Sequence, residues 1–482
     1  MKAATIIVGN EQKGFFFGLG KEMAPDYAIH FIVDNPVVKR LLHEQVSDVD
    51  YKVTVMPDRR QWKVAEEGIL EKAALIESRY GVRLAHLMGQ DRAWGFGYLT
   101  NIEKYPTIRR AFWPRKLKIQ HVVDELEFFE HSLTDSELVI SQFPTTALTV
   151  VCDRLGIAHY HPTAIKYGDR YFWSDDSYQG SRSYFREIDE NIKDPSRSDV
   201  SNNNAYEVDA VGKLINSLSE YSIWPATKKA SKHIIRDAFN SILRRRKRNG
   251  YRVFGWLPSI FRKGAHYRFV RKHSSKVGEL NSEKFVYFPL HMEPEVALLQ
   301  FSPENINTIE SIIWISKNLP VGWLLVVKEQ ANVFAVRSRR FYERLISMPN
   351  VILACPDSNS WDWIKNADFV ATISGTTGQE AVHFSKPVMT FSPHHVINRL
   401  PTVFFVQSFY DVKSTIDQLV SSPPSIDSLL RSRNALCAAQ LSCSFEMKEY
   451  KHNYKSSRPM VAEVRRAKEA LYDTLRSSPD QC

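Results

Sequence analysis

No stretch of this sequence approaches the roughly 20 consecutive apolar residues that a membrane-spanning helix needs. Its start, MKAATIIVG, stays apolar for only about six residues, which is shorter than a signal-peptide core and predicts a first β-strand. The sequence also lacks internal repeats and low-complexity tracts. We therefore expect a folded protein that is soluble or peripheral, with no signal for export.

Cysteine is scarce, with five residues among 482 and no C-x-x-C pair. The number is odd and the spacing is irregular, so neither a disulfide framework nor a structural zinc site is expected. A reducing, cytoplasmic setting fits this pattern best, and no metal is assigned to any residue.

The excess positive charge is confined to one part of the chain. Residues 228–276 hold 16 Lys and Arg against the single Asp237, which leaves 48 of the 64 basic and 53 of the 54 acidic residues for the rest. This segment, with RRRKR followed by FGWLPSIF, has the composition of a surface that meets anionic lipid. A solvated basic helix between domains is an equally good interpretation. Nucleic acid is not expected, since no recognised binding motif accompanies the charge.

Two series of short apolar runs alternate with helical patterns, which predicts parallel βαβ units. The first series runs through ATIIVG, AIHFIVD, VRLAHLMG, ELVISQ and IAHYHP, and the second through KFVYFPLH, WLLVVKE, VILACP, FVATIS and PVMTFS. The fold class expected is α/β, with two Rossmann-like lobes at residues 1–185 and 281–410. Residues 186–280 are expected to form a loop and basic helical connection, with 178–204 as a polar loop. Residues 411–482 are expected to be helices that brace the lobes.

Polar residues follow four strands of the second series, where ligands of parallel sheets bind. These are His291 and Glu293 in FPLHMEPE, Lys328 and Glu329 in VKEQ, the loop ACPDSNSW, and Ser374, Gly375, Thr376, Thr377, Gly378 and Glu380 in SGTTGQE. Small residues and hydroxyls at a helix start favour a phosphate, and Glu380 one turn later suits ribose hydroxyls. The simpler alternatives are a capped turn, an exposed lysine and a structural histidine.

The segments FVYFPLHMEPE, NLPVGWLLVVKE and FYERLISMPNVILACPDSNSWDWIKNADFVATISGTTGQEAVHFSKPVMTF resemble the capsule polysaccharide synthesis proteins, which include 3-deoxy-manno-octulosonic acid (Kdo) transferases. This resemblance covers about residues 284–406 and is weaker over the first lobe. It implies a GT-B glycosyltransferase fold with a nucleotide-sugar donor on the second lobe, no obligatory metal and no further cofactor. The family has Gln-Pro where this chain has Glu293-Pro294, and His-Pro where it has Gln330-Ala331.

Acceptor chemistry is expected on the first lobe, where a base must deprotonate a hydroxyl. Asp91 is the first candidate because it follows the expected strand VRLAHLMG, and Glu11 in GNEQKG is the second. Arg92 is a candidate for binding the acceptor because a cation pairs with an acidic sugar or a phosphate. Lys166 and Arg170 are candidates because they stand among the aromatic residues of PTAIKYGDRYFW, a composition suited to stacking on sugar rings. A surface salt bridge and a polar turn are the plain alternatives for these residues.

These observations predict a glycosyltransferase of capsule or surface polysaccharide synthesis, with a nucleotide-sugar donor, CMP-linked as one option, and a lipid-linked or glycan acceptor. Attachment to the inner face of the plasma membrane through residues 228–276 is an added expectation. Two alternatives remain: a sugar-nucleotide epimerase, which needs no acceptor, and a non-enzymatic assembly factor, which the two altered pairs suggest.

Overall fold

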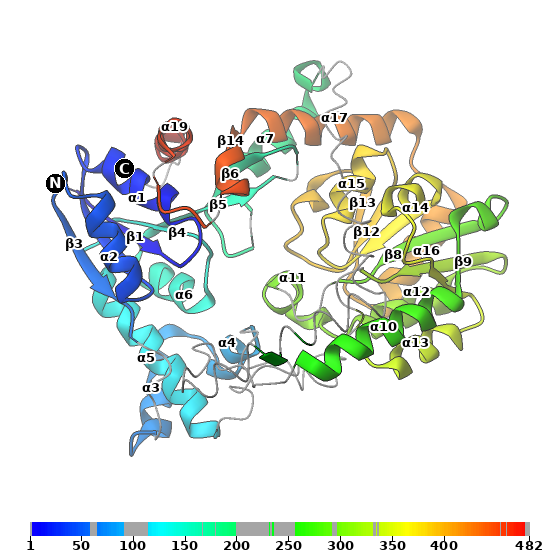
Figure 1. Ribbon diagram of the computed structural model, residues 1–482. Coiled ribbons are helices and arrows are strands. Elements are labelled where there is room, and N and C mark those ends of the chain that lie inside the picture. The colour runs from blue at the N-terminus through cyan, green and yellow to red at the C-terminus, as the bar shows by residue number, and fades with distance from the viewer. Residues whose placement is uncertain are drawn as a thin grey trace. The chain divides into compact units, whose positions relative to one another are not determined.

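The computed structural model describes residues 2–57, 65–90, 114–165, 167–178, 180–198, 231, 234–235, 256–291, 296–330, 334, 337–453, 455–458 and 460–477. They form two compact α/β units, whose elements are labelled in Figure 1. Unit 1 takes the described parts of Met1–Leu87, Pro114–Tyr206 and Cys437–Cys482, and unit 2 those of Met88–Trp113 and Glu207–Leu436. The expected class, α/β with two Rossmann-like lobes, is confirmed.

Unit 1 is built on a seven-stranded sheet with the order β14-β6-β5-β4-β1-β2-β3. The strands from β3 to β5 are parallel, whereas β6 and β14 pair in antiparallel fashion. Its elements are β1 Lys2–Val8, α1 Lys13–Met23, β2 Tyr27–Val33, α2 Pro36–Gln45, β3 Tyr51–Val55, α3 Ile69–Tyr80, α5 Arg115–Leu133, β4 Leu138–Ser141, α6 Thr146–Leu155, β5 Ala158–Ala164, β6 Arg170–Ser174, α7 Arg182–Lys193, η2 Pro195–Ser198, β14 Phe445–Glu446, α18 Lys448–His452 and α19 Val461–Ser477.

One face of this sheet carries the core that α1 and α19 close. Phe15, Phe16 and Phe17 of α1 are fully buried, together with Val464 and Leu471 of α19. Burying each such side chain contributes roughly 1.5–3 kcal/mol. The C-terminal helix, expected to brace the first lobe, therefore packs on the first helix of unit 1.

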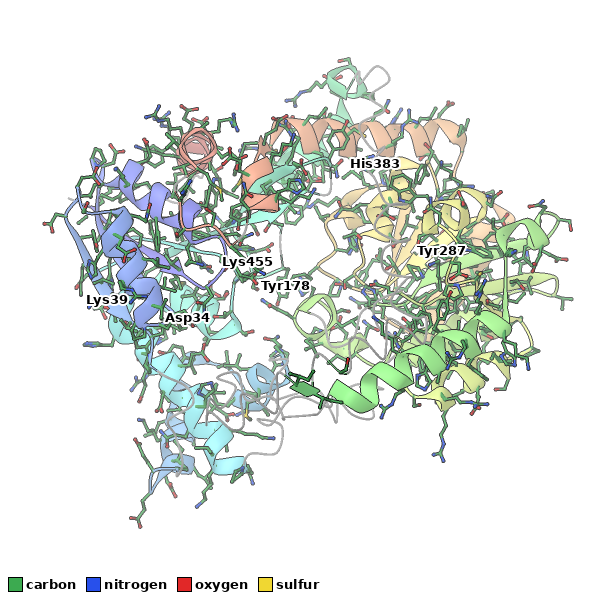
Figure 2. All side chains as sticks on the ribbon, in the orientation of Figure 1. Asp34, Lys39, Tyr178, Tyr287, His383 and Lys455 are labelled. Carbon is green, nitrogen blue, oxygen red and sulfur yellow. The ribbon has the colours of Figure 1, made fainter. Side chains whose placement is uncertain are left out.

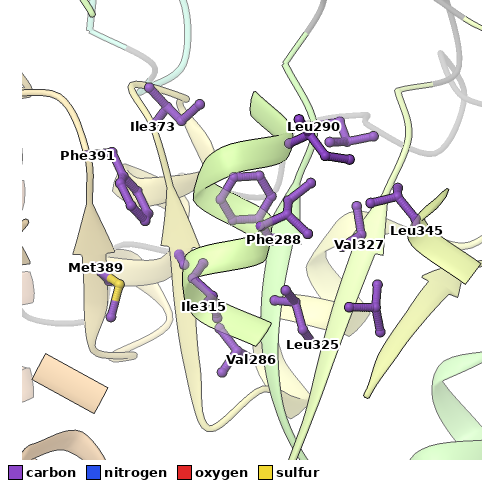
Figure 3. Packing of buried hydrophobic residues seen from close by; sticks show 14 of the residues in the cluster. Val286, Phe288, Leu290, Ile315, Leu325, Val327, Leu345, Ile373, Met389 and Phe391 are labelled. Carbon is purple, nitrogen blue, oxygen red and sulfur yellow. The ribbon is translucent and has the colours of Figure 1, made fainter. Parts of the chain in front are cut away.

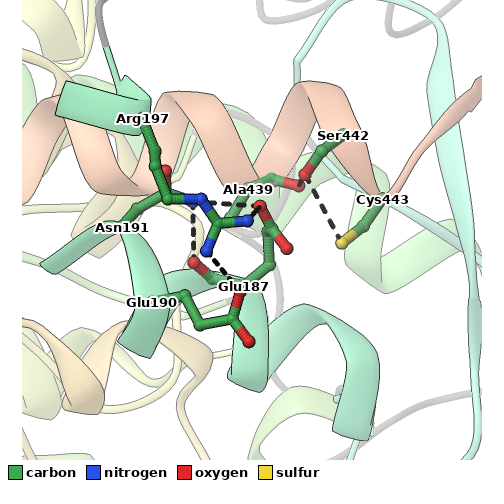
Figure 4. A network of polar contacts seen from close by, with 7 residues as sticks. All are labelled: Glu187, Glu190, Asn191, Arg197, Ala439, Ser442 and Cys443. Carbon is green, nitrogen blue, oxygen red and sulfur yellow. Dashed lines mark hydrogen bonds and ion pairs between the residues drawn. The ribbon is translucent and has the colours of Figure 1, made fainter. Parts of the chain in front are cut away.

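The segment expected as a polar loop, residues 178–204, contains helix α7, so that expectation was wrong for Arg182–Lys193. The helix is amphipathic, with Tyr184 and Ile188 buried at i, i+4 spacing. Arg197 then folds back and pairs with Glu187 and Glu190 of the same helix, as Figure 4 shows beside the end of α17. Helix α7 forms with few aliphatic residues because only one of its faces is buried.

Unit 2 has a second seven-stranded parallel sheet with the order β13-β12-β11-β8-β9-β10-β7. Its elements are α10 Trp256–Lys272, β7 Ser274–Ser275, η4 Val277–Leu280, β8 Lys284–Pro289, α11 Val296–Leu299, η5 Pro303–Asn305, α12 Thr308–Asn318, β9 Trp323–Lys328, α13 Arg339–Ile346, β10 Val351–Ala354, α14 Ser360–Asn366, β11 Phe369–Thr372, α15 Thr377–His383, β12 Val388–Thr390, η6 Val396–Arg399, β13 Val403–Phe405 and α16 Phe409–Ser421.

The core of unit 2 fills one face of this sheet. Figure 3 shows Val286 and Phe288 of β8 beside Leu325 and Val327 of β9, with Ile315 of α12 packed on them. Alternation along a strand sends every second side chain to the opposite face. Since Val327 faces this core, the next residue, Lys328, belongs to the other face of the sheet.

Two further elements differ from the expected boundaries. The run VRLAHLMG is helix α4 (Leu84–Gln90) rather than a strand, because Leu84 and Leu87 at i, i+3 bury one helical face. Residues 411–482 divide between the units: α16 packs on α12 in unit 2, while α17 (Ile426–Ser442) ends among residues of unit 1. The connection 186–280 is likewise shared, with α7 in unit 1 and α10 in unit 2.

Candidate functional site

The order of strands in unit 2 marks one place for a ligand. The chain forms β8, moves outward through β9 and β10, and then returns to lay β11 on the other side of β8. In open parallel sheets, ligands bind outside the carboxyl ends of the strands where the order reverses in this way. The candidate site therefore lies beyond the ends of β8 and β11.

His291 and the SGTTG loop meet at this place. The backbone N–H of Ser374 donates to Nε2 of His291 at 3.4 Å, and a Cβ on Gly375 would lie 3.1 Å from the ring. Because a backbone N–H can only donate, Nε2 accepts and the ring proton sits on Nδ1. Burial lowers the pKa of His291 to about 3, and Arg337 and His395 add to this effect. The imidazole is thus neutral and positions the loop.

His395 holds the other side of the same loop and was missed from the sequence. Its Nε2 donates to the carbonyl oxygen of Gly375 at 3.0 Å, while Nδ1 accepts from the N–H of Ile397 at 3.4 Å. Burial lowers the pKa of His395 to about 4, against the opposing effect of its bond to Gly375. His395 follows the strand PVMTFS, so the same strand-end rule applied there would have found it.

The two glycines of the loop are explained by packing inside the lobe. A Cβ on Gly375 would lie 2.9 Å from Oγ1 of Thr372, and one on Gly378 would lie 2.9 Å from Cδ1 of Ile397. The N–H of Gly375 already donates to Thr372, at 3.2 Å. The expected role of these glycines at a phosphate stays a prediction. Thr376 is the exposed residue of the loop, while Ser374, Gly375 and Thr377 are half-buried.

Lys328, the last residue of β9, is a buried cation. It is 4% exposed as a residue, and the described residues give its ammonium group no hydrogen bond or ion pair. Burial lowers the pKa of Lys328 to about 8, and the nearby Glu329, Cys355 and Asp357 offset part of that effect. Burying an ammonium group without a partner costs free energy. An anion that reached Lys328 would therefore not have to displace another partner.

Glu329 is committed to the interior of the lobe. It is 3% exposed, and both of its oxygens accept from Nη1 of Arg337, at 2.7 and 2.6 Å. The hydroxyl of Tyr342 donates to it as well, at 2.7 Å. A donor would have to displace these partners to contact Glu329, and the expected contact stays a prediction. Glu380, also expected at the donor, is half-buried on α15 and stays a prediction.

In unit 1, Arg170 is likewise committed to the fold. Its Nε donates to Oγ of Ser444 at 2.7 Å and one Nη donates to the carbonyl oxygen of the same residue at 2.5 Å. Arg170 thus fastens the C-terminal segment to β6, and its expected role in binding an acceptor stays a prediction. Glu11 is exposed in the loop after β1 and stays a prediction. Asp91, Arg92, Lys166 and Glu293 lie outside the described residues.

Membrane attachment and metal binding are the two remaining expectations for this chain. Over the described ranges, no helix is both long and apolar enough to cross a bilayer, and no three His, Cys, Asp or Glu residues gather as metal ligands. Most of the basic segment 228–276 precedes α10 and falls outside those ranges. Metal independence and membrane attachment therefore stay predictions.

No known family model matches the chain, and no curated protein matches its sequence. Among solved structures it is similar to the UDP-GlcNAc 2-epimerase of Neisseria meningitidis bound to UDP-GlcNAc, at 13% identity and TM-score 0.29 over 99% of this chain and 100% of that one. It is also similar to the KpsC β-Kdo 2,7 transferase of Thermosulfurimonas dismutans, at 12% identity and TM-score 0.32 over 73% and 90%. A glycosyltransferase from Rickettsia africae is similar at 11% identity and TM-score 0.28, over 99% of this chain and 100% of that one. None of these likenesses identifies a ligand or reaction for this chain.

Proposed function

We propose that the protein is a glycosyltransferase whose second lobe binds the phosphate of a nucleotide-sugar donor. The observation that carries this proposal is the pairing of His291 with Ser374 at the switch point between β8 and β11, with the unpaired Lys328 on the strand beside β8. The loop supplies amides and hydroxyls from Thr376 and Thr377. Helix α15 has only seven residues, so most of the positive charge comes from Lys328.

Such a site suits group transfer because negative charge builds on the phosphate as the sugar leaves. A fixed cation in a buried setting stabilises that charge more strongly than it would in water. The acceptor hydroxyl must lose a proton as the new bond forms. Glu11 and Asp91 remain the candidates for that base.

The resemblance of residues 284–406 to capsule polysaccharide synthesis proteins supports a surface polysaccharide as the product. The chain keeps the Gly-Thr pair at Gly375 and Thr376 and the Glu-Ala pair that begins at Glu380. We propose a lipid-linked or glycan acceptor, reached from the inner face of the plasma membrane. The basic segment 228–276 is the proposed point of attachment.

Lys328→Met tests the donor site. Methionine fills a similar volume without charge, so the variant is expected to fold at least as stably as the wild type. Calorimetric titration with CMP-, UDP- and GDP-sugars should show binding of at least one to the wild type. Loss of a charge-assisted hydrogen bond should then weaken that binding about tenfold or more. Thr376→Ala should weaken it less, because the threonine is neutral.

Lys317→Met is the matched control, because Lys317 is an exposed lysine on α12 of the same lobe. It should leave nucleotide binding unchanged. Equal affinity in Lys328→Met and wild type would rule out this donor site. Conversion of the bound nucleotide sugar in the absence of any acceptor would instead favour an epimerase.

A further inference from the structure

Unit 1 has a switch point of its own. Its strand order places β4 beside β1, with β2 and β3 on the other side of β1. The loops beyond the carboxyl ends of these strands hold residues 9–12 after β1, 34–35 after β2 and 142–145 after β4. By the rule used for unit 2, this edge is the place where the first lobe should meet a ligand.

Carboxamides and one carboxylate join these loops. Asn10 donates from Nδ2 to Oδ2 of Asp34 at 2.5 Å, and Asn35 donates from Nδ2 to Oδ1 of Asn10 at 3.1 Å. Gln142 donates from Nε2 to Oε1 of Gln12. Asn10 and Asp34 are exposed, and Figure 2 labels Asp34. Each of these groups keeps further hydrogen-bonding capacity, since a carboxylate accepts several bonds and an amide nitrogen donates two.

Gln12 is held in a conformation that non-glycine residues rarely adopt. Its φ is 54°, in the left-handed region, at the residue just before α1. The side chain reaches Gln142 from there, and Gly9 makes room, because a Cβ at Gly9 would lie 3.2 Å from Oε1 of Gln142. Non-glycine residues held in this region cluster at functional sites.

Phe143 stands at the same edge with 60% of its surface exposed. Its backbone is nonetheless fixed: its carbonyl oxygen accepts from Oγ of Ser141 at 2.9 Å and from the N–H of Thr145 at 3.0 Å. His159 braces Ser141 at 2.8 Å. One exposed aromatic residue is unremarkable by itself. Phe143 directly follows Gln142 in this loop, so the edge offers an apolar side chain together with hydrogen-bonding groups, as small-molecule sites do.

The edge is unsuited to a phosphate. The N–H of Gly14 in the first turn of α1 donates to the carbonyl oxygen of Ser456 at 3.1 Å, and Arg458 fills the space at its Cα. The ammonium group of Lys13 donates to the carbonyl oxygen of Asn10 and is buried. Within residues 9–12, 34–35 and 142–145 the charged groups are the exposed carboxylates of Glu11 and Asp34, which repel anions.

We propose that this edge binds an uncharged sugar ring, which stacks on Phe143 and donates and accepts hydrogen bonds with Asn10, Asp34 and Gln142. Binding of the sugar follows from unit 1 alone. The role of this sugar as the acceptor of glycosyl transfer rests on the function proposed above. In that role, Glu11 of the loop after β1 would deprotonate a hydroxyl group of the bound sugar.

Saturation-transfer NMR and calorimetry on the full chain test the proposal with methyl glycosides of glucose, galactose and N-acetylglucosamine, and with methyl glucuronoside as an acidic probe. At least one neutral glycoside should bind the wild type, and the acidic one should not. Phe143→Ala should weaken neutral binding roughly three- to tenfold. Leu75→Ala, which removes a 69% exposed side chain from α3, is the matched control and should change nothing.

A second variant tests whether the carboxylates exclude an acidic sugar. Asp34→Asn removes one of the two exposed carboxylates and should let the glucuronoside bind, while Asp50→Asn, an exposed residue just before β3, should not. No binding of any neutral glycoside, equal binding by Phe143→Ala and Leu75→Ala, or tight binding of the glucuronoside to the wild type would each overturn the proposal. A parallel nucleotide titration reports on the second lobe separately, so failure here is distinct from failure of the proposed donor site.

Discussion

Arg337 lies fully buried on the carboxylate of Glu329, with Nη1 2.7 and 2.6 Å from its two oxygens. The other terminal nitrogen donates to the carbonyl oxygen of His291 at 2.5 Å. This pair therefore ties the end of β9 to His291, the second residue after β8. The altered position at Gln330 sits next to the pair, and its own N–H donates to Glu329 at 2.8 Å.

Arg337→Met should destabilise the second lobe severely. It leaves Glu329 buried with only Tyr342 as a side-chain partner, and breaking a buried ion pair costs about 3–5 kcal/mol. Chemical denaturation followed by tryptophan fluorescence measures the loss. Arg339→Met is the control: Arg339 pairs with Glu343 on the exposed face of α13, and such pairs contribute about 0.3–0.5 kcal/mol. A similar small effect for both variants would contradict the structural role given to the buried pair.

Nucleotide affinity should fall as the pH rises above about 8. The pKa of Lys328 is lowered to about 8 in the free protein, so the ammonium loses its charge over the next units of pH. A bound phosphate would raise that pKa, and binding near pH 8 should take up protons. Calorimetry in buffers of different ionisation enthalpy measures the uptake. Lys328→Met should show neither the proton uptake nor this decline, and an identical pH profile in the variant would count against the assignment.

Lys328 should lower the free energy of unfolding at neutral pH. Its folded-state pKa of about 8 lies below the ordinary lysine value of 10.5, so between these values the unfolded chain binds the additional proton and stability rises with pH. Below pH 8 the penalty is complete, at about 3 kcal/mol. Lys328→Met should therefore raise the free energy of unfolding at pH 7 by about 1–3 kcal/mol. This advantage should shrink as the pH approaches 10.5, which denaturation at pH 7 and pH 10 would measure.

The polar residues at the carboxyl ends of β8, β9 and β11 could be found from sequence because strand patterns are local. Their roles could not, since burial decides them. Lys328 and Glu329 are adjacent, yet among the described residues only the glutamate has an ion-pair partner, Arg337 eight residues later. No local pattern links Arg337 to either of them.

Errors of fold came from segments where a short pattern fits two structures. In VRLAHLMG the apolar residues suit a buried strand or a helix, and tertiary packing of Leu84 and Leu87 selects the helix. Arg170 illustrates the same limit for function. Its partners at Leu441 and Ser444 are some 270 residues away in sequence, so its role in fastening β14 was not visible.

Stability of the second lobe should fall in mild acid because His395 is buried in its neutral form. Its folded-state pKa of about 4 lies below the ordinary histidine value of 6.5, so between these values only the unfolded chain takes up the proton. The loss is about 1.4 kcal/mol per pH unit for each such histidine. His395→Asn keeps an acceptor for the N–H of Ile397 but does not titrate. Between pH 6.5 and 5 it should lose about 2 kcal/mol less than the wild type; an equal loss would contradict the assignment.

Gly14→Ala should loosen the C-terminal segment of unit 1. A Cβ at Gly14 would collide with the carbonyl group of Arg458, and the N–H of Gly14 would lose its bond to Ser456. Because backbone atoms form the obstacle, the segment must move, at a cost of roughly 1–3 kcal/mol. Hydrogen exchange should then increase in Lys448–His452 and around Ser456. Gly278→Ala, which meets open space in unit 2, is the control.

The segment also covers the first turn of α1, so its displacement in Gly14→Ala would move Gln12. Sugar binding at the edge of unit 1 should therefore weaken in the same variant. Unchanged exchange in Gly14→Ala would show that the close contact does not hold the segment in place.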